Sequence, residues 1–229
     1  MDRVRLCVSA IRPKTLFAGI SPVLLGLAIN QHLNHHTHLG LAILTLLTCL
    51  LLQISSNLIN DYYDAISGVD TKNRLGPTRI SSATPKNKQL VRQGFIFTMS
   101  LALLLGLYLI YQGGAPIAII GVASLITAFL YTGGPFPLSY FALGEVLAFV
   151  FFGPIAVWGT AHLQHPVLDH ELTILLGFIP GFFSAAIMSV NNYRDQIQDA
   201  QAKKYTLSVF LGKNLSRLLP IIFILGAFI

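Results

Sequence analysis

Seven stretches of this chain are apolar over lengths that match the thickness of a lipid bilayer, and this feature restricts the fold more than any other. A membrane-spanning helix needs about 20 mostly apolar residues. With 54% hydrophobic and 10% charged residues, the chain also has too few charges to cover a soluble globule. The sequence therefore predicts an all-α, multi-pass transmembrane helix bundle in which residues 1–229 form a single domain. We expect six complete spans and a seventh that begins near Leu215, at 15–30, 41–60, 94–111, 116–132, 143–161, 172–190 and 215–229.

The positions of the basic residues predict the orientation of the bundle. All fifteen Lys and Arg residues lie in the N-terminal tail, in residues 61–93 or in residues 194–217. When the helices are counted from an N terminus on the inside, these segments all fall on one side of the membrane, as the positive-inside rule requires. The net charge of +6 therefore reflects topology, and nucleic acid is not expected as a partner. We expect the N terminus and both polar segments to face the cytoplasm.

All seven histidines lie in two connections on the other side of the membrane. A tract such as "HLNHHTH" is one pattern that binds metal. The simpler interpretation, which we favour, is a polar loop without the positive charge that opposes translocation. The histidines are His32, His35, His36, His38, His162, His165 and His170.

The first of two acidic clusters lies where the second span ends, in the stretch "NLINDYYDAISGVD" at 57–70. If the helix continues through this stretch, Asp61 and Asp64 share one face, and Asn57 and Asn60 lie one turn earlier. A carboxylate within the membrane costs about 2.5–3.5 kcal/mol on insertion scales. A cluster of them therefore indicates a positively charged partner.

The second cluster, "NNYRDQIQD" at 191–199, follows the sixth span in the same way. Asn191, Asp195 and Asp199 are spaced four residues apart and so share one face of a helix. A single cluster would more simply be a helix cap, but two similar clusters after spans of the same direction weaken that alternative. We expect the two helices to face each other across a common site.

The residue types in these clusters predict the ligand. Carboxylate and amide oxygens, without thiolate or imidazole, select Mg²⁺, Mn²⁺ or Ca²⁺ over zinc or copper. Arg and Lys residues lie in the same segments, and magnesium is often shared between one or two carboxylates and phosphate oxygens. The sequence therefore predicts a magnesium and diphosphate site that opens into an apolar chamber, with a lipid diphosphate as its occupant.

At these residues the chain resembles the UbiA superfamily of intramembrane aromatic prenyltransferases. "NDYYD" at 60–64 is similar to the family's first motif, Asn-Asp-x-x-Asp, and 191–199 is similar to its second, Asn-x-x-x-Asp-x-x-x-Asp. Within the family, the nearer resemblance is to members that prenylate 1,4-dihydroxy-2-naphthoate. The segments that carry it span nearly the whole chain and are "RPKTLFAGISPVLLG" at 12–26, "GPTR" at 76–79, "YTGGPFPLSYFALGE" at 131–145, "FFGP" at 151–154 and "KKYTLSVFLG" at 203–212.

The resemblance implies an enzyme of menaquinone synthesis in the bacterial inner membrane. Its substrates would be a polyprenyl diphosphate and 1,4-dihydroxy-2-naphthoate, and its products demethylmenaquinone, CO₂ and diphosphate. The implied cofactor is Mg²⁺, with Mn²⁺ as a substitute. The implied metal ligands are Asn60, Asp61, Asp64, Asp70, Asn191, Asp195 and Asp199. Catalysis would depend on Asp61, Asp64 and Asp195, with Asp64 as the base.

The resemblance also implies roles for basic and aromatic residues. The diphosphate would be bound by Arg12, Lys14, Arg79, Arg194 and Lys203. An allylic cation would meet the aromatic faces of Tyr131, Phe151 and Phe152. Glu145 would contact the acceptor, contact the residues that bind the acceptor, or cap the helix that begins beside Glu145. The first motif departs from the family pattern at Gly68, where an aspartate is common, and Asp70 lies two residues further on.

Several alternatives stay open at this point. The family fold has nine helices, so we expect about seven here, the last incomplete, with the final two absent. Another aromatic acceptor, such as 4-hydroxybenzoate or a protohaem or chlorophyll-type substrate, would suit the same motifs. A transporter coupled to divalent cations or protons and a diphosphate phosphatase are alternatives of other classes. Prenyl chain length and oligomeric state are not determined by these residues.

Overall fold

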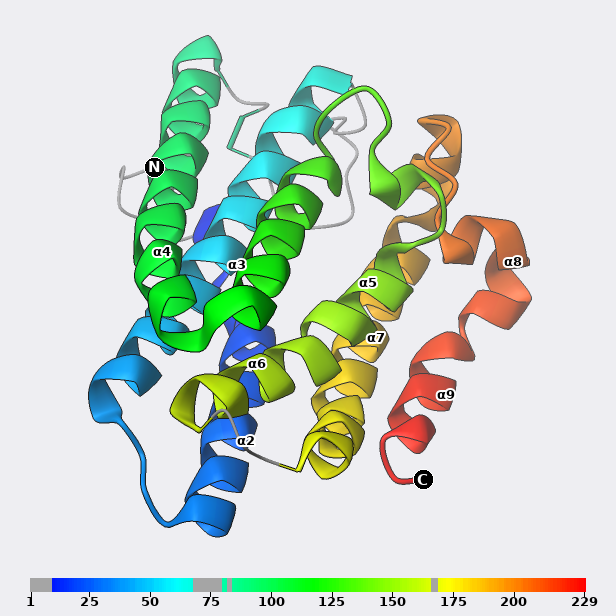
Figure 1. The fold of residues 1–229 in the computed structure, drawn as a ribbon. Helices are drawn as coiled ribbons and strands as arrows, with labels where there is room; N and C mark the ends of the chain where they lie inside the picture. Colours follow the sequence, from blue (N-terminus) through cyan, green and yellow to red (C-terminus); the bar gives the residue numbers. More distant parts are fainter. Residues whose placement is uncertain (1–9, 68–79, 82–83, 166–168) are drawn as a thin grey trace.

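The computed structural model describes residues 10–67, 80–81, 84–165 and 169–229. Within these residues the chain is helical, apart from short connections and one isolated bridge between Phe141 and Tyr205. A short 3₁₀ helix spans Leu138–Tyr140. Figure 1 shows the longer α-helices running roughly parallel and antiparallel in one bundle. They are α2 (Pro13–Asn34), α3 (Leu39–Ser67), α4 (Pro85–Leu130), α5 (Gly144–Phe151), α6 (Pro154–Gln164), α7 (His170–Gln201), α8 (Leu207–Ser216) and α9 (Leu219–Gly226).

Each predicted span overlaps one of these helices or a helix pair almost completely, so the expected all-α membrane bundle is confirmed. The third and fourth spans are both part of α4, which is 46 residues long. Gly114 interrupts it with a φ of 67°, a left-handed conformation that favours glycine, and Pro116 follows. The chain reverses there, so that the two halves of α4 lie antiparallel (Figure 1).

The fifth span is broken into α5 and α6 around Gly153, and the break packs tightly on α7. A Cβ atom on Gly153 would lie 2.7 Å from the Gly177 carbonyl oxygen and 2.7 Å from the Gly181 Cα. A Cβ on Gly177 would in turn lie 2.6 Å from the Pro154 Cα. Small residues thus allow two backbones to approach closely, which is how helices in lipid gain packing energy.

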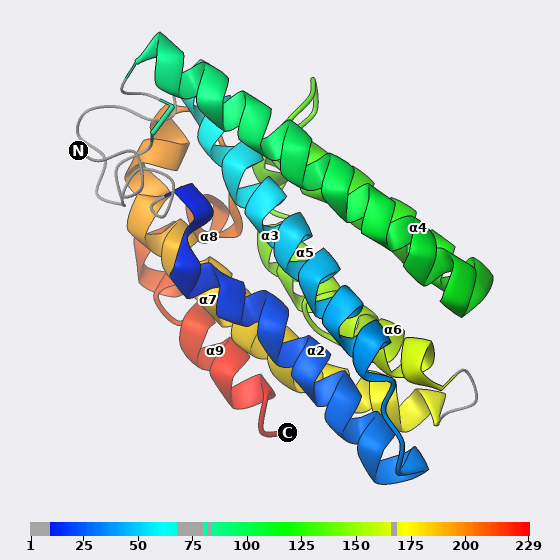
Figure 2. The ribbon, with the colours of Figure 1, turned by 90° about the vertical axis from the view of Figure 1, so that its left-hand side faces the viewer.

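The seventh span is a bent pair, because α8 and α9 meet at 94°. Figure 2 shows α9 beside α7, with α2 on the near side. Large exposed apolar side chains, such as Phe17, Leu104 and Ile119, cover the outer faces of the long helices. Such surface suits contact with lipid tails.

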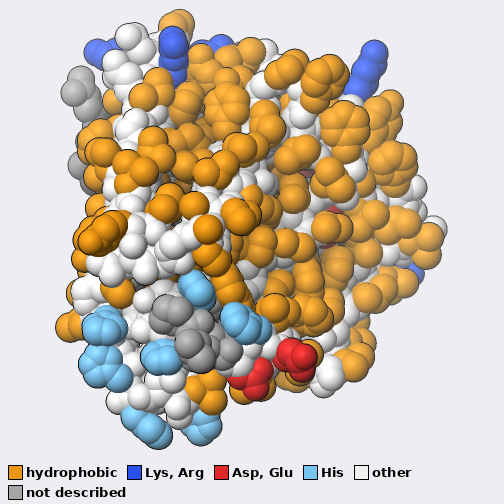
Figure 3. All heavy atoms as spheres, in the orientation of Figure 1, with side chains coloured by type: hydrophobic (Ala, Val, Ile, Leu, Met, Phe, Trp, Pro, Cys, Tyr) orange, Lys and Arg blue, Asp and Glu red, His pale blue; other side chains and the backbone are white. Residues whose placement is uncertain are grey.

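Charged side chains are distributed unevenly between the two ends of the bundle. In Figure 3 the Lys and Arg side chains gather mainly at one end, whereas the histidines gather at the other with Asp and Glu side chains. Both predicted acidic clusters lie at the basic end, since α3 and α7 terminate there (Figure 1). The bundle therefore brings together residues that lie about 130 positions apart in the sequence.

Candidate active site

A cavity of about 710 Å³ lies between α2, α3, α4, α5, α6 and α7, and both acidic clusters contribute to its walls. Its charged and amide lining gathers mainly toward the basic end of the bundle and consists of Arg12, Lys14, Gln53, Asn57, Asn60, Asp61, Asp64, Asn191, Asn192, Arg194, Asp195 and Lys204. Much of the remaining wall is apolar or aromatic and includes Pro22, Leu52, Leu147, Ile155, Ile187 and the predicted Tyr131, Phe151 and Phe152. The cavity thus combines a charged end with a largely apolar interior.

Asp61 is a buried carboxylate of the α3 cluster that is held by backbone groups. It is 2% exposed, and its two oxygens accept hydrogen bonds from the backbone N–H groups of Ile80 and Ser81, each at 3.2 Å. Hydrogen bonds to a charged acceptor are stronger than neutral ones. The two donors are backbone groups, so they orient the side chain without adding a charged partner.

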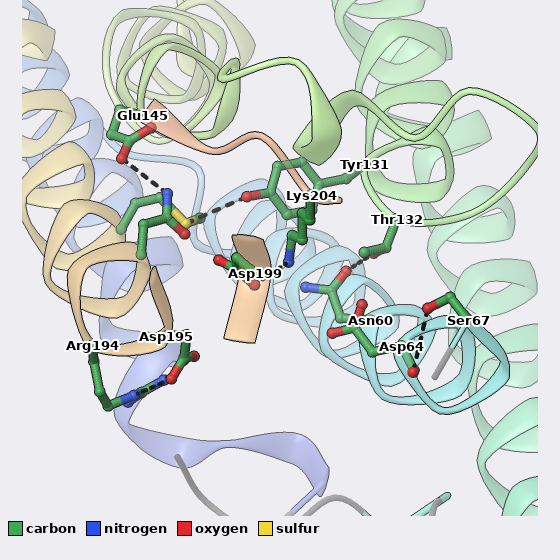
Figure 4. Close-up of polar contacts among 12 residues, drawn as sticks. Asn60, Asp64, Ser67, Tyr131, Thr132, Glu145, Arg194, Asp195, Asp199 and Lys204 are labelled. Atoms are coloured by element: carbon green, nitrogen blue, oxygen red, sulfur yellow. Dashed lines mark hydrogen bonds and ion pairs between the residues drawn. The ribbon is translucent and has the colours of Figure 1, made fainter. Parts of the chain in front are cut away.

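The two asparagines of the α3 cluster connect this helix to its neighbours. Asn57 donates to the Ile11 carbonyl at 2.9 Å and to the Thr15 hydroxyl at 3.0 Å, at the start of α2. Asn60 accepts a hydrogen bond from the Thr132 hydroxyl, just beyond α4 (Figure 4). These contacts fix the position of the α3 end relative to α2 and α4.

Asp64 completes the α3 cluster and lies one turn beyond Asn60. Its side chain is 3% exposed and lines the cavity. Its backbone carbonyl accepts a hydrogen bond from the Ser67 hydroxyl at 3.3 Å in the last turn of α3. Asp61 and Asp64 therefore share the cavity-facing side of the helix, as their spacing predicts.

The carboxylates of the α7 cluster are paired with basic residues. Arg194 binds Asp195 through two parallel hydrogen bonds, Nε to Oδ1 at 2.8 Å and Nη2 to Oδ2 at 2.7 Å. Asp199 is buried, and its Oδ1 lies 3.7 Å from Nζ of Lys204. In Figure 4 Asp199 and Lys204 lie toward Asn60, whereas the Arg194–Asp195 pair lies apart from them on α7.

Lys204 reaches this region because the chain turns sharply after α7. Lys203 has a φ of 56°, and the Lys204 N–H then donates to the Asp199 carbonyl at 2.8 Å. The turn leaves Lys203 exposed and directs Lys204 into the cavity. Of the two neighbouring lysines, the cavity wall thus includes Lys204 and not the predicted Lys203.

Tyr131 lies between the two clusters, directly after the end of α4. Its hydroxyl donates to the sulfur of Met188 at 3.4 Å. As the donor in this contact, the Tyr131 phenol places a hydrogen-bonding group in the wall of the cavity.

The remaining predicted residues divide into those at the cavity and those elsewhere. Arg12, Lys14, Arg194, Asn191 and Asp195 line it, and Asp199 lies behind the lining in its pair with Lys204. Asp70 and Arg79 lie outside the described residues. Asn192 also lines the cavity, although sequence reasoning assigned it no role. The signal available for it was its polarity within a membrane helix.

The donor set suits magnesium only if a substrate completes the coordination. Among the residues that the structure describes, no three His, Cys, Asp or Glu side chains lie close enough to hold a metal ion by themselves. Magnesium in proteins is commonly held by one or two carboxylates together with phosphate oxygens and water. Asp61 and Asp64 on α3, and Asp195 on α7, offer such carboxylates on the wall of one cavity.

Comparison with known proteins gives a family and several relatives. A model described as "UbiA prenyltransferase family" matches residues 19–229. A Haemophilus influenzae protein named 1,4-dihydroxy-2-naphthoate octaprenyltransferase is 36% identical over 219 residues, which cover 92% of this chain and 70% of that protein. A Mycobacterium tuberculosis protein of the same name is 35% identical over 212 residues, covering 93% and 72%.

A vertebrate relative is also similar over most of the chain. The Danio rerio protein named UbiA prenyltransferase domain-containing protein 1 is 33% identical over 221 residues. These cover 91% of this chain and 62% of that protein. The similarity of all three relatives therefore includes both acidic clusters and the helices that carry them.

Proposed function

The chain belongs to the UbiA prenyltransferase family, and from this premise we propose that it transfers a polyprenyl chain from its diphosphate to 1,4-dihydroxy-2-naphthoate. The proposal rests on the cavity. Its charged end is lined by the α3 and α7 carboxylates together with Arg12, Lys14, Arg194 and Lys204. A diphosphate needs positive charge, and an isoprenoid chain needs apolar walls. The names of the relatives in Haemophilus influenzae and Mycobacterium tuberculosis support the naphthoate as acceptor.

In the proposed reaction, the allylic C–O bond to the diphosphate breaks and a C–C bond forms at the ring carbon that carries the carboxylate. Loss of CO₂ from that carbon restores the aromatic ring. The immediate product is the demethylated menaquinol, with CO₂ and diphosphate, and a later two-electron oxidation gives the quinone. The reaction itself therefore requires no oxidant.

Magnesium, held by Asp61 and Asp64 on one side and Asp195 on the other, would neutralise charge on the leaving diphosphate. Asn60, Asn191 and Asp199 would support these ligands, and Arg12, Lys14, Arg194 and Lys204 would bind the phosphate oxygens. Electrostatic groups already in place at the developing charge lower the barrier to ionisation.

Asp64 is proposed as the base for the acceptor. Its carboxylate accepts the proton of a phenolic hydroxyl as the C–C bond forms, which increases the electron density on the ring. The proton returns to the oxygen when CO₂ leaves. The apolar and aromatic walls, including Phe151 and Phe152, exclude water that would otherwise capture the cation.

The alternatives predict other arrangements or products. A transporter requires ionisable groups that are accessible from both faces. Among the described residues, the cavity acids lie at one end of the bundle, whereas Asp169 and Glu171 lie at the other. A diphosphate phosphatase would admit water and release a prenyl alcohol. We propose that the catalytic end faces the cytoplasm of a bacterial inner membrane, in accord with the positive-inside rule.

The test is an assay of membranes that contain the protein. They are incubated with a radiolabelled polyprenyl diphosphate, Mg²⁺ and either 1,4-dihydroxy-2-naphthoate or 4-hydroxybenzoate. We expect a prenylated naphthoquinone after extraction in air, and we expect EDTA to abolish it and added Mg²⁺ to restore it. Product from 4-hydroxybenzoate alone would show that the acceptor is misassigned, and prenyl alcohol alone would favour the phosphatase.

A further inference from the structure

Glu145, in the first turn of α5, is buried next to the cavity without being part of its lining. It is 2% exposed. Its Oε1 accepts a hydrogen bond from Nδ2 of Asn192 at 2.9 Å, whereas its Oε2 is buried and has no hydrogen-bond partner among the described residues. Nor does any Lys or Arg of the described part of the chain form an ion pair with it. A buried carboxylate that is only half satisfied is costly, so its retention requires an explanation.

The position of Glu145 near a helix N terminus offsets part of this cost. The unpaired N–H groups in the first turn of a helix favour a negative charge. No Lys or Arg of the described part of the chain pairs with Glu145, so the wall beside it lacks the positive charge that an anionic diphosphate needs. This wall is therefore suited to a substrate group that donates hydrogen bonds, such as a hydroxyl on an aromatic ring.

Asn192 is the residue through which Glu145 reaches the cavity. It lies on α7, lines the cavity and is directly preceded by Asn191 of the second motif. Because its Nδ2 donates to Glu145, the amide is oriented with its oxygen directed away from that carboxylate. This oxygen has no hydrogen-bond partner among the described residues, and it is not among their fully buried, unpartnered atoms. It is thus available as an acceptor.

The neighbouring contacts hold Asn192 beside Tyr131. A Cβ atom on Gly144 would lie 2.9 Å from the Tyr131 hydroxyl and 3.5 Å from Nδ2 of Asn192, so both side chains pack over this glycine. Tyr131 donates to the sulfur of Met188 on α7, one turn before Asn192, which donates to Glu145. Rotation of the Asn192 amide would break its bond to Glu145.

We propose that Glu145 is a positioning residue that orients the Asn192 amide, so that its oxygen accepts a hydrogen bond from a hydroxyl of the aromatic acceptor. The inference rests on the proposed function and deepens it, since it assigns the acceptor to the α5 and α7 wall of the cavity. The diphosphate lies apart from this wall, among the basic residues at the charged end.

The test compares the KM values for the two substrates in full-length Glu145→Ala, Glu145→Gln and Asn192→Ala variants. Both alanine variants should raise the KM for 1,4-dihydroxy-2-naphthoate about tenfold, as expected for loss of one oriented hydrogen bond. The KM for the polyprenyl diphosphate should change less than about twofold. Glu145→Gln keeps an oxygen that can accept from Asn192, so its acceptor KM should stay within about threefold of the wild-type value.

The matched control is Glu171→Gln, because Glu171 also lies in the first turn of a helix but is exposed at the opposite end of the bundle. It should behave as the wild type in both KM values. The double variant Glu145→Ala/Asn192→Ala should be no worse than Asn192→Ala alone, because the two residues act as one unit. A monodisperse elution profile in detergent establishes that each variant is folded.

Either of two outcomes would overturn this inference and leave the proposed function intact. One is a parallel rise in both KM values, which indicates a general structural role for Glu145. The other is a folded Glu145→Ala variant with unchanged KM values when Asn192→Ala is impaired. If Glu145→Ala does not fold, failure of Glu145→Gln to keep the wild-type acceptor KM decides against the inference. A wild-type protein that prenylates neither naphthoate nor 4-hydroxybenzoate would instead overturn the proposed function, and the inference with it.

Discussion

Asp61 on α3 and Asp195 on α7 line one cavity but are held in opposite ways. Asp61 is oriented by two neutral backbone N–H groups, whereas Asp195 is clamped by both arms of the Arg194 guanidinium. Neutral donors do not offset the charge of a carboxylate, whereas a guanidinium largely cancels it. Under the proposed function, Asp61 would therefore contribute more negative charge at the metal than Asp195, and Asp195 would bring with it a basic group that a diphosphate can share.

The largest effect is expected when either carboxylate is neutralised. Asp61→Asn and Asp195→Asn should each lower prenyl transfer about 100-fold or more, because charge stabilisation at the leaving group is lost. Both variants should still insert into the membrane, since the amide keeps the size of the side chain. Initial rates in membranes, with the amount of inserted protein measured by immunoblot, test this prediction.

The two variants should differ in their KM for the prenyl diphosphate and in the Mg²⁺ concentration that they require. In Asp195→Asn, Arg194 is released from its ion pair and stays available to the diphosphate, so the KM for the prenyl diphosphate should stay near the wild-type value. In Asp61→Asn, the half-maximal rate should require more Mg²⁺. Full activity in either variant would contradict the metal-site hypothesis.

An intermediate effect is expected from Arg194→Lys. Lysine keeps the charge but cannot form two parallel bonds to Asp195 or to a phosphate. We expect about a tenfold lower kcat/KM for the polyprenyl diphosphate, with little change in the KM for the acceptor. The conservative Lys213→Arg variant, in the last turn of α8 and outside the cavity lining, is the control. An equal loss in both would show that the effect of Arg194→Lys is not specific to the cavity.

The smallest effect is expected from the backbone contact to Asp61. Ser81→Pro removes one of the two N–H donors, whereas Ser81→Ala removes only the hydroxyl and keeps the N–H. A hydrogen bond to a charged group contributes about 1.5–3 kcal/mol, and Ile80 still holds the carboxylate, so we expect a three- to tenfold lower rate for the proline variant. The alanine variant should be close to wild type. Equal rates for the two variants would show that this backbone contact does not orient Asp61.

The sequence predicted the membrane helices and both acidic clusters well. The cluster residues Asp61 and Asp64 share a helical face, and Asn191 and Asp195 meet them at one cavity, as their spacing predicts. The breaks within the spans were harder to predict from the sequence. Gly114 and Pro116 lie at one break, and Gly153 and Pro154 at another, but whether such residues bend a helix depends on the helix that packs against them.

Sequence reasoning did not predict which residues the charged side chains contact. Lys203 and Lys204 are adjacent and chemically identical, and only the left-handed turn at Lys203 decides that Lys204 lies in the cavity. Asn57 lies one turn before the first motif, and its amide nitrogen holds the start of α2. Its role depends on a contact between residues 46 positions apart.

The sequence by itself determined that this chain crosses a membrane and carries two acidic clusters at one end of its helices. These properties follow from segment lengths and from periodicity along single helices, which are local quantities. Only the tertiary structure decided that Asp61 is held by backbone amides, that Asp195 pairs with Arg194, and that Glu145 meets Asn192. Successive side chains along a helix are rotated by about 100° around the helix axis. Contacts between helices therefore depend on rotations and distances that are set by packing of the whole bundle.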